Sequence, residues 1–260
     1  MIDLFEKAAI AAGRDIMDVF HNGPTVRTKS DASPVTEADE RAEAIILAAL
    51  AAQFPAIPVV AEEAVAAGNI PQTGDQPFIL VDPLDGTKEF IRKSSDFTVN
   101  IALIEAGVPV MGIVYAPARG QAYIGDRSGA LKIEIDANFQ PVSRQSIMVR
   151  TPSGPLIAVA SRAHSGPETE EFLLNHAITD TRSVGSSLKF CLVAEGAADV
   201  YPRFGRTMEW DTAAGDAVLR AAGGMTVGPD GAPLLYGKRD QPDDSDFANP
   251  SFIAWGDRQA

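Results

Sequence analysis

The chain has 260 residues, with 22 basic and 35 acidic side chains and a formal net charge of −13. This acidic surplus argues against a nucleic acid polymer or an anionic membrane as the main partner, because both attract positively charged surfaces. The single cysteine excludes an internal disulfide framework, and no apolar run is long enough to span a bilayer. We therefore expect a cytoplasmic protein with no integral membrane contact; peripheral attachment to the inner face of the membrane stays open.

Two helices are expected near the N-terminus. Residues 3–20 carry apolar side chains at helical spacing. A second helix is expected over residues 36–53, because Thr36 is a suitable N-cap residue and Asp39 stands where the acid of a capping box lies.

Short strands follow these helices. The connections EAGVP, APARG and GDRSG between the later strands contain Gly or Pro and are typical of hairpins, so this sheet is expected to be rich in antiparallel pairs. The predicted strands are residues 57–61, 78–81, 98–104, 110–115, 121–124 and 131–135.

From about residue 151 the pattern changes to strands alternating with helices, which predicts a second, smaller α/β sheet. The expected elements are a strand at 156–160 and helices at 169–176, 187–195 and 212–222. We therefore expect an α/β architecture in two parts, residues 1–150 and residues 151–260.

Acidic residues stand at the ends of several predicted elements. Glu62 and Glu63 follow the apolar segment IPVVA, Asp82 and Asp85 follow FILV, and Asp211 opens a predicted helix. A solvated strand end, a turn residue or a helix cap would explain each acid separately. None of these explanations accounts for acids at so many ends.

If these ends meet, several carboxylates share a small space and cannot all stay ionised without a compensating cation. Oxygen ligands alone favour Mg²⁺ or Mn²⁺, and the three histidines lack the spacing of a zinc site. Gly86 and Thr87, at the start of a short helix, then suggest a phosphate-binding site formed by backbone N–H groups. Bound metal would make a pocket in this acidic protein locally positive.

A set of motifs extends from about Thr36 to the end of the chain: VAEE, LVDPLDGTKEFI, FTVNIAL, GIVYAP, SRAH, GSSLKFCLVAEGAADVYPRFG and EWDTAAGDAVLRAAGG. In order and spacing it resembles the inositol monophosphatase superfamily of Mg²⁺-dependent, lithium-sensitive phosphatases. The resemblance implies a layered α/β sandwich with alternating α-β-α-β-α layers. It also implies that residues 1–150 carry most of the metal ligands and residues 151–260 carry Asp211 and the leaving-group pocket.

Within the superfamily the chain most resembles the 3'(2'),5'-bisphosphate nucleotidases. Residues 88–90, Lys-Glu-Phe, look like that branch, whereas inositol phosphatases more often have Thr-Asn-Phe. Phe204 stands where inositol phosphatases resemble one another in having a substrate-binding acid. Two departures from the family pattern are Ala61, where a serine is common, and residues 206–208 before Glu209.

The resemblance implies two Mg²⁺ ions, with a third, weaker ion left open. Asp82 would bridge the two ions, and Glu63 and Asp39 would lie near them. The implied metal ligands are Glu62, Asp82, the carbonyl of Leu84, Asp85 and Asp211.

The implied reaction hydrolyses adenosine 3',5'-bisphosphate to AMP and phosphate during sulfur assimilation; 3'-phosphoadenylyl sulfate is a further candidate substrate. Thr87 would orient the attacking water, with Asp39 or Glu62 as proton acceptor, so the expected catalytic residues are Asp39, Glu62 and Thr87. Lys189 and a backbone N–H seat at residues 185–187 are expected to hold the non-reacting 5'-phosphate or the nucleoside. The expected substrate-binding residues are Glu62, Leu84, Asp85, Gly86, Thr87, Ser161, His164, Gly185, Ser186, Ser187, Lys189, Arg203 and Asp211.

Other functions stay open at this point. An inositol-phosphate or sugar-phosphate phosphatase would use the same metals with a different leaving-group pocket. A catalytically silent nucleotide sensor would be expected to lack a ligand acid, and none is missing. A homodimer is compatible with the sequence, but no pattern in it requires one.

Overall fold

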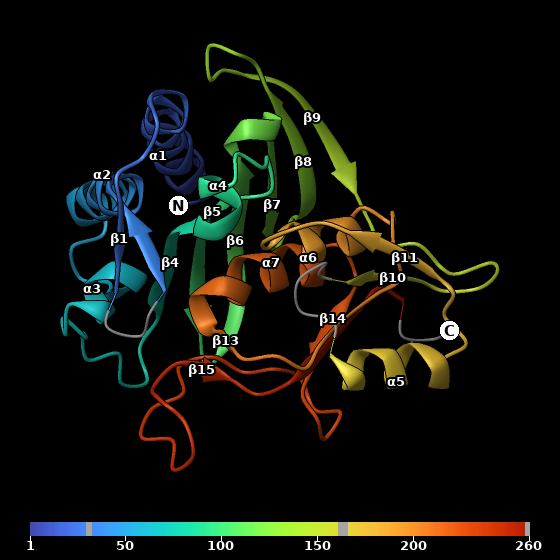
Figure 1. The fold of residues 1–260 in the computed structure, drawn as a ribbon. Coiled ribbons are helices and arrows are strands. Elements are labelled where there is room, and N and C mark those ends of the chain that lie inside the picture. Colours follow the sequence, from blue (N-terminus) through green and yellow to red (C-terminus); the bar gives the residue numbers. More distant parts are fainter. Residues whose placement is uncertain (30–32, 161–165, 258–260) are drawn as a thin grey trace.

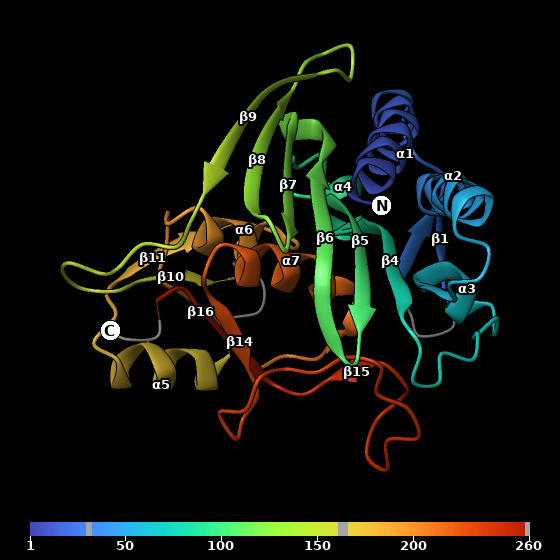
Figure 2. The same ribbon diagram turned by 180° about the vertical axis from the view of Figure 1, so that it is seen from behind.

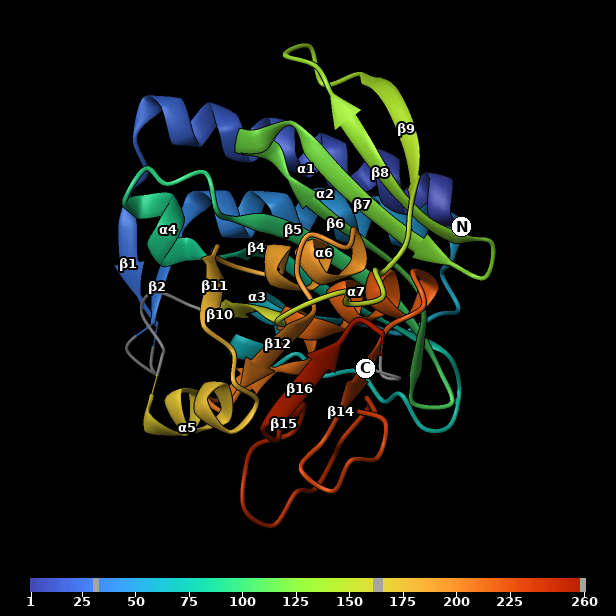
Figure 3. The ribbon, with the colours of Figure 1, turned by 90° about the vertical axis from the view of Figure 1, so that its right-hand side faces the viewer.

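Five layers in the order α-β-α-β-α make up the structure, a computed structural model that describes residues 1–29, 33–160 and 166–257 (Figures 1 and 2). Helices α1 (Ile2–Asn22) and α2 (Glu37–Gln53) cover one face of a seven-stranded sheet. Helices α6 (Leu188–Ala194) and α7 (Glu209–Ala221) fill the space between this sheet and a five-stranded sheet. Helix α5 (Pro167–Asn175) packs on the outer face of the second sheet (Figure 3). The expected layered sandwich is confirmed.

The larger sheet has the strand order β3-β4-β5-β6-β7-β8-β9. Only β3 and β4 are parallel, so the predicted antiparallel hairpins are confirmed. Strand β9 was not predicted, because nearly all its side chains are exposed and show no apolar alternation. The strands are β3 (Val59–Ala61), β4 (Phe78–Asp85), β5 (Thr98–Glu105), β6 (Val108–Ala116), β7 (Gln121–Asp126), β8 (Gly129–Ile135) and β9 (Pro141–Ile147).

The smaller sheet has the strand order β11-β10-β12-β16-β14. Strand β10 is parallel to both of its neighbours, whereas β16 is antiparallel to β12 and β14. Only β10 was predicted; β11 is exposed along its whole length and β14 has only three residues. The strands are β10 (Ile157–Ala160), β11 (Asp180–Ser183), β12 (Val200–Arg203), β14 (Met225–Val227) and β16 (Phe252–Trp255).

The remaining elements are short. They are β1 (Val26–Thr28), β2 (Pro34–Thr36), α3 (Glu62–Ala66), α4 (Thr87–Ile91), η1 (Pro117–Arg119), β13 (Thr207–Met208) and β15 (Ala248–Asn249). No helix within the described ranges is both long and apolar enough to cross a membrane.

Helix α7 lies unusually close to the larger sheet. Gly112 of β6 and Gly125 of β7 are paired across the strands. A Cβ at Gly125 would stand 2.5 Å from the Cα of Val218, and one at Gly112 would stand 2.9 Å from the Cα of Ala214. The two glycines therefore let the α7 backbone approach the sheet. The division into residues 1–150 and 151–260 stays a prediction, since α6 and α7 of the second part pack on the first sheet.

Candidate active site

The acids that the sequence singled out lie near the end of β4, at the start of α3 and in the first turn of α7. The parallel register pairs Ala61 with Val81, so Glu62, the first residue of α3, follows beside Asp82, which still pairs with Asn100 of β5. The register of β4 against β5 shifts between Asp82 and Asp85, which turns the chain at that point. Asp211 lies in the first turn of α7 as its third residue.

Asp211 was expected to open its helix, and this detail was wrong. The helix begins at Glu209, and the Asp211 carboxylate accepts a hydrogen bond of 2.8 Å from the backbone N–H of Met208. The acid therefore caps the helix from inside the first turn.

The acids influence one another electrostatically. Burial raises the pKa of Asp82 well above its usual range, and the charges of Glu62, Asp85 and Asp211 raise it further. Burial, Asp85 and Glu62 raise the pKa of Asp211 in the same way. Carboxylates gathered in one buried space favour either protonation or a bound cation.

In this structure the compensating charge is an ammonium group. The Nζ of Lys29 lies 2.7 Å from Glu62 and 2.6 Å from Glu63. Burial alone would lower the pKa of Lys29, but the two glutamates outweigh that effect and raise it. Sequence reasoning missed Lys29, because a lone lysine in the polar segment before residue 30 gives no signal of its contacts.

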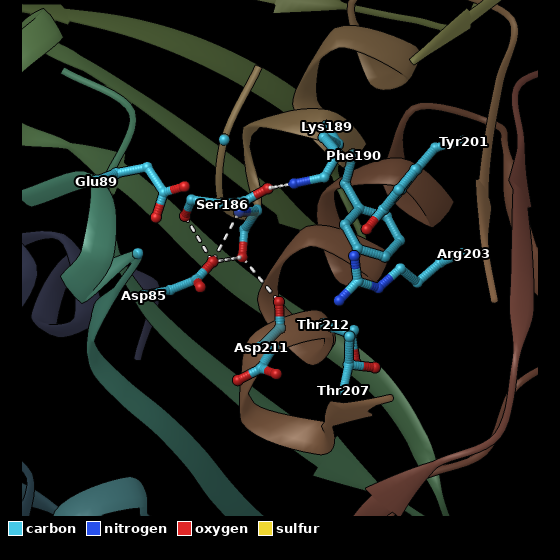
Figure 4. Close-up of a pocket in the computed structure, with 13 residues that line it drawn as sticks. Asp85, Glu89, Ser186, Lys189, Phe190, Tyr201, Arg203, Thr207, Asp211 and Thr212 are labelled. Atoms are coloured by element: carbon cyan, nitrogen blue, oxygen red, sulfur yellow. Dashed lines mark hydrogen bonds between the residues drawn. The ribbon is translucent and has the colours of Figure 1, made fainter. Parts of the chain in front are cut away.

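Asp85 is held by the C-terminal part of the chain. Its carboxylate accepts hydrogen bonds from the Ser186 hydroxyl at 2.5 Å and from the Ser187 backbone N–H at 2.8 Å. The Ser187 hydroxyl in turn donates to the backbone carbonyl of Asp211 at 2.8 Å (Figure 4). These contacts join the end of β4 to the starts of α6 and α7.

The donor set fits a hard divalent cation. It consists of the carboxylates of Glu62, Asp82, Asp85 and Asp211, with raised pKa values at three of them, and Mg²⁺ prefers such oxygen ligands. Among the described residues, no three His, Cys, Asp or Glu side chains are already arranged around one point as a metal site. The partners of Glu62, Asp85 and Asp211 explain this, since each carboxylate is turned toward an internal donor.

Asp39 and Thr87 lie together beside these acids. The Thr87 hydroxyl donates to Oδ1 of Asp39 at 3.0 Å. The other oxygen of Asp39 accepts from the backbone N–H of Thr36, so the expected capping box is present. Burial raises the pKa of Asp39, and the hydrogen bonds from Thr36 and Thr87 partly offset this. Of the two candidate proton acceptors, the structure brings Asp39, and not Glu62, into contact with Thr87.

Gly86 adopts a left-handed conformation, with φ at 92°. A Cβ there would stand 3.1 Å from the Asp96 carbonyl oxygen, so glycine is needed for both conformation and space. Thr87 follows as the first residue of α4. The strand–turn–helix connection thus carries Asp82, Asp85 and Thr87 in one short segment, from the end of β4 to the start of α4.

A pocket opens next to Asp85 and Asp211 (Figure 4). Lys189, Arg203 and Tyr201 line it from the C-terminal part, and Glu89 lines it from α4. Tyr201 and Glu89 were not predicted as lining residues; Glu89 had been noted only as part of the Lys-Glu-Phe motif.

Lys189 is buried, with 6 % of its surface exposed, and is therefore not a solvated helix lysine. Burial lowers its pKa to about 8, although the charge of Asp85 opposes this. Its Nζ donates to the Ser186 carbonyl at 2.7 Å and lies 5.4 Å from the centre of the Tyr201 ring.

Arg203 donates only to carbonyls of its own loop, at Gly205 and Arg206, and pairs with no carboxylate of the described chain. Its charge is therefore available to an anion in the pocket.

The expected seat of free backbone N–H groups at residues 185–187 is not present. The N–H of Gly185 donates to Asp96 at 3.0 Å, and that of Ser187 donates to Asp85 at 2.8 Å. Gly185, Ser186 and Ser187 still line the pocket, but two of their N–H groups hold the protein's own carboxylates.

Ser161 and His164, which were expected to bind substrate, lie outside the described residues. Phe204 is described, and its ring lies tilted against that of Phe172 of α5, with the ring centres 6.1 Å apart, in the cluster on the outer face of the smaller sheet. It does not line the pocket.

Comparison with known proteins agrees with this architecture. Residues 1–245 match the model of the inositol monophosphatase family. The chain is 44% identical over 254 residues to the 3'(2'),5'-bisphosphate nucleotidase CysQ of Escherichia coli K12, covering 97% of this chain and 98% of that protein. It therefore belongs to the inositol monophosphatase family.

Two further relatives extend the comparison. The chain is 39% identical to the CysQ nucleotidase of Buchnera aphidicola, covering 98% of this chain and 93% of that protein. The crystal structure of CysQ from Bacteroides thetaiotaomicron, described as a bacterial member of the inositol monophosphatase family, superposes with a TM-score of 0.79 at 38% identity. That superposition covers 99% of this chain and 97% of the other.

Proposed function

We propose that the protein is a metal-dependent 3'(2'),5'-bisphosphate nucleotidase, which removes the 3'-phosphate of adenosine 3',5'-bisphosphate and releases AMP. The observation that carries the proposal is one pocket in which Lys189 and Arg203 lie beside Asp85 and Asp211. A substrate with one phosphate would need only the metal ions that the carboxylates hold. A second phosphate needs cations at a distance from the first, and the two basic side chains supply them. We extend the proposal to 3'-phosphoadenylyl sulfate, which carries the same 3'-phosphate.

Glu62, Asp82, Asp85, Asp211 and the Leu84 carbonyl would hold up to two Mg²⁺ ions, with Glu63 and Asp39 near a third. When bound, Mg²⁺ would lower the pKa of the attacking water and neutralise charge on the scissile phosphate and the leaving ribose oxygen. We assign the proton transfer and the substrate contacts to residues of this chain.

Because the Thr87 hydroxyl donates its hydrogen to Asp39, its oxygen lone pairs can accept a hydrogen bond from the attacking water. Water oxygen forms the new bond to phosphorus while the bond from phosphorus to the 3'-oxygen breaks. The water proton passes through Thr87 to Oδ1 of Asp39, whose pKa is raised by burial, which makes the carboxylate a better proton acceptor. The 3'-oxygen takes its proton from solvent. We assign Gly86 and Thr87 to the scissile phosphate, and Lys189 and Arg203 to the 5'-phosphate.

Substitution of Lys189 tests the assignment of the second phosphate. Lys189→Ala should raise KM for adenosine 3',5'-bisphosphate by at least about tenfold, since a charged hydrogen bond is worth roughly 1.5–3 kcal/mol. The same variant should change the hydrolysis of inositol 1-phosphate much less, because that substrate has no second phosphate. Lys7→Ala, at an exposed lysine of α1, is the matched control. Equal losses on both substrates would refute the assignment.

A further inference from the structure

The helix that presents Glu62 and Glu63 lacks a cap of its own. Helix α3 is five residues long, and its N-cap residue is Ala61, with φ −120° and ψ 142°. The first N–H groups of a helix have no partner within the helix, and a Ser, Thr, Asp or Asn at the N-cap usually accepts one of them. Alanine has no side-chain acceptor, and no side-chain cap is formed by Ala61.

Glu43 of α2 takes over this contact from another element. Its side chain is 6 % exposed, and its Oε2 accepts the backbone N–H of Glu63 at 2.8 Å. The N–H of Ala64 also hydrogen-bonds to this carboxylate. Glu63 and Ala64 are the second and third residues of α3, whose N–H groups an N-cap side chain would otherwise receive.

Helix α2 thereby contacts both sides of the site. Asp39 holds the Thr87 hydroxyl at the start of α4, and Glu43, one helical turn further along the same face, holds the start of α3. A buried carboxylate close to the charge of Glu62 is an unfavourable choice for stability alone. The unfavourable position of the Glu43 carboxylate is explained if its function is to orient Glu62.

We propose that Glu43 is a positioning residue for the metal site: by capping α3 in place of Ala61, it fixes the direction in which Glu62 and Glu63 leave the backbone. The proposal rests on the proposed function, because it takes Glu62 as a metal ligand. Partners that orient metal ligands typically contribute 10- to 100-fold to metal affinity.

The test measures the equilibrium affinity of the metal-free, full-length protein for Mn²⁺ alone, together with its free energy of unfolding without metal. Glu43→Ala should weaken Mn²⁺ binding by about tenfold or more. Glu43→Gln keeps an acceptor oxygen and should lose less. Glu40→Ala is the matched control, since Glu40 lies on the same helix with a half-exposed side chain paired to Arg27, and it should leave the affinity unchanged.

A rescue separates the capping role from general damage to the fold. Ala61→Ser offers a hydroxyl acceptor at the N-cap, so in the Glu43→Ala background it should restore most of the lost Mn²⁺ affinity. If Glu43→Ala does not fold, the same comparison is made with Glu43→Gln, with and without Ala61→Ser. Unchanged Mn²⁺ affinity in the Glu43 variants, or a loss that Ala61→Ser leaves in place, would overturn the proposal.

Glu62→Gln distinguishes this proposal from the function on which it rests. It should weaken Mn²⁺ binding at least as much as Glu43→Ala does. If Glu62→Gln binds Mn²⁺ normally, the ligand assignment fails and the role of Glu43 fails with it. If Glu62→Gln weakens binding and the Glu43 variants do not, only the role of Glu43 is overturned.

Discussion

Thr87 connects the phosphate end of the site to Asp39 through one hydrogen bond of 3.0 Å. We expect Thr87→Ala to lower kcat by about 10²-fold or more and to change KM much less, because a proton relay contributes mainly in the transition state. Steady-state kinetics at saturating Mg²⁺ measures both constants.

Thr87→Ser keeps the hydroxyl and should retain most of the activity, which separates the hydrogen bond from packing of the methyl group. A Thr87→Ala variant with normal kcat and raised KM would show that Thr87 only binds substrate.

The raised pKa values of Asp82 and Asp211 predict how Mg²⁺ stabilisation depends on pH. In the metal-free folded state these carboxyls bind protons at a pH where those of the unfolded chain have lost theirs. Lowering the pH therefore favours the metal-free folded state and displaces the cation. The rise in Tm caused by MgCl₂ should therefore shrink as the pH falls through the window in which these carboxyls take up protons.

Thermal unfolding in MgCl₂ and in NaCl of equal ionic strength isolates the specific effect of the metal. An equal rise in Tm at both ends of the window would contradict the assignment of Asp82 and Asp211 as ligands that must lose protons.

A site residue can be predicted from the sequence when the residues next to it in the chain show its structural context. Asp82 and Asp85 come after an apolar run and before a glycine, so their place near the end of β4 can be inferred. Lys29 has no such context, and its contacts with Glu62 and Glu63 depend on long-range packing. The same holds for Lys189, whose burial cannot be derived from helical spacing alone.

At the scale of elements, α7 combines two tasks, because it carries Asp211 and packs against the paired glycines of β6 and β7. Gly125→Ala would place a Cβ 2.5 Å from the Cα of Val218, so the helix must move. We expect a loss of about 1–3 kcal/mol in the free energy of unfolding, as for other overpacked cores. Because the displaced helix holds Asp211, the affinity for Mg²⁺ should fall as well.

Denaturant unfolding and Mg²⁺ titration measure these two effects. Gly129→Ala is a useful comparison, since a Cβ there meets no atom within 4 Å, although its positive φ still adds backbone strain. If Gly125→Ala leaves both quantities unchanged, the close approach of α7 is not needed for the site.

Elements were predicted where periodicity was strong and missed where it was weak. Helix α1 and the hairpins of the larger sheet have clear apolar patterns. Strand β11 is exposed along its whole length, and β14 has only three residues, so neither carries a readable alternation. The start of α7 was placed three residues late, because Asp211 resembles an N-cap residue and Met208 does not.

At the scale of the whole molecule, the site lies between the larger sheet and the layer of α6 and α7, because Asp82 and Asp85 belong to β4 and Asp211 belongs to α7. The larger sheet and α3 supply Glu62, Asp82 and Asp85, whereas the layer of α6 and α7 supplies Asp211 and Lys189. Hydrogen bonds from Ser186 and Ser187 to Asp85 join the two groups. The cations of the pocket, Lys189 and Arg203, thus come from the second half of the chain, whereas its carboxylates come from both halves.

The most direct test of this account is kcat/KM for adenosine 3',5'-bisphosphate and for inositol 1-phosphate, measured side by side in Mg²⁺ with the nucleotide product identified. We expect the bisphosphate to be preferred by at least about tenfold, the contribution of one charged hydrogen bond to the second phosphate. The product should be AMP, with its 5'-phosphate retained. A preference for inositol 1-phosphate, or release of the 5'-phosphate, would contradict the account.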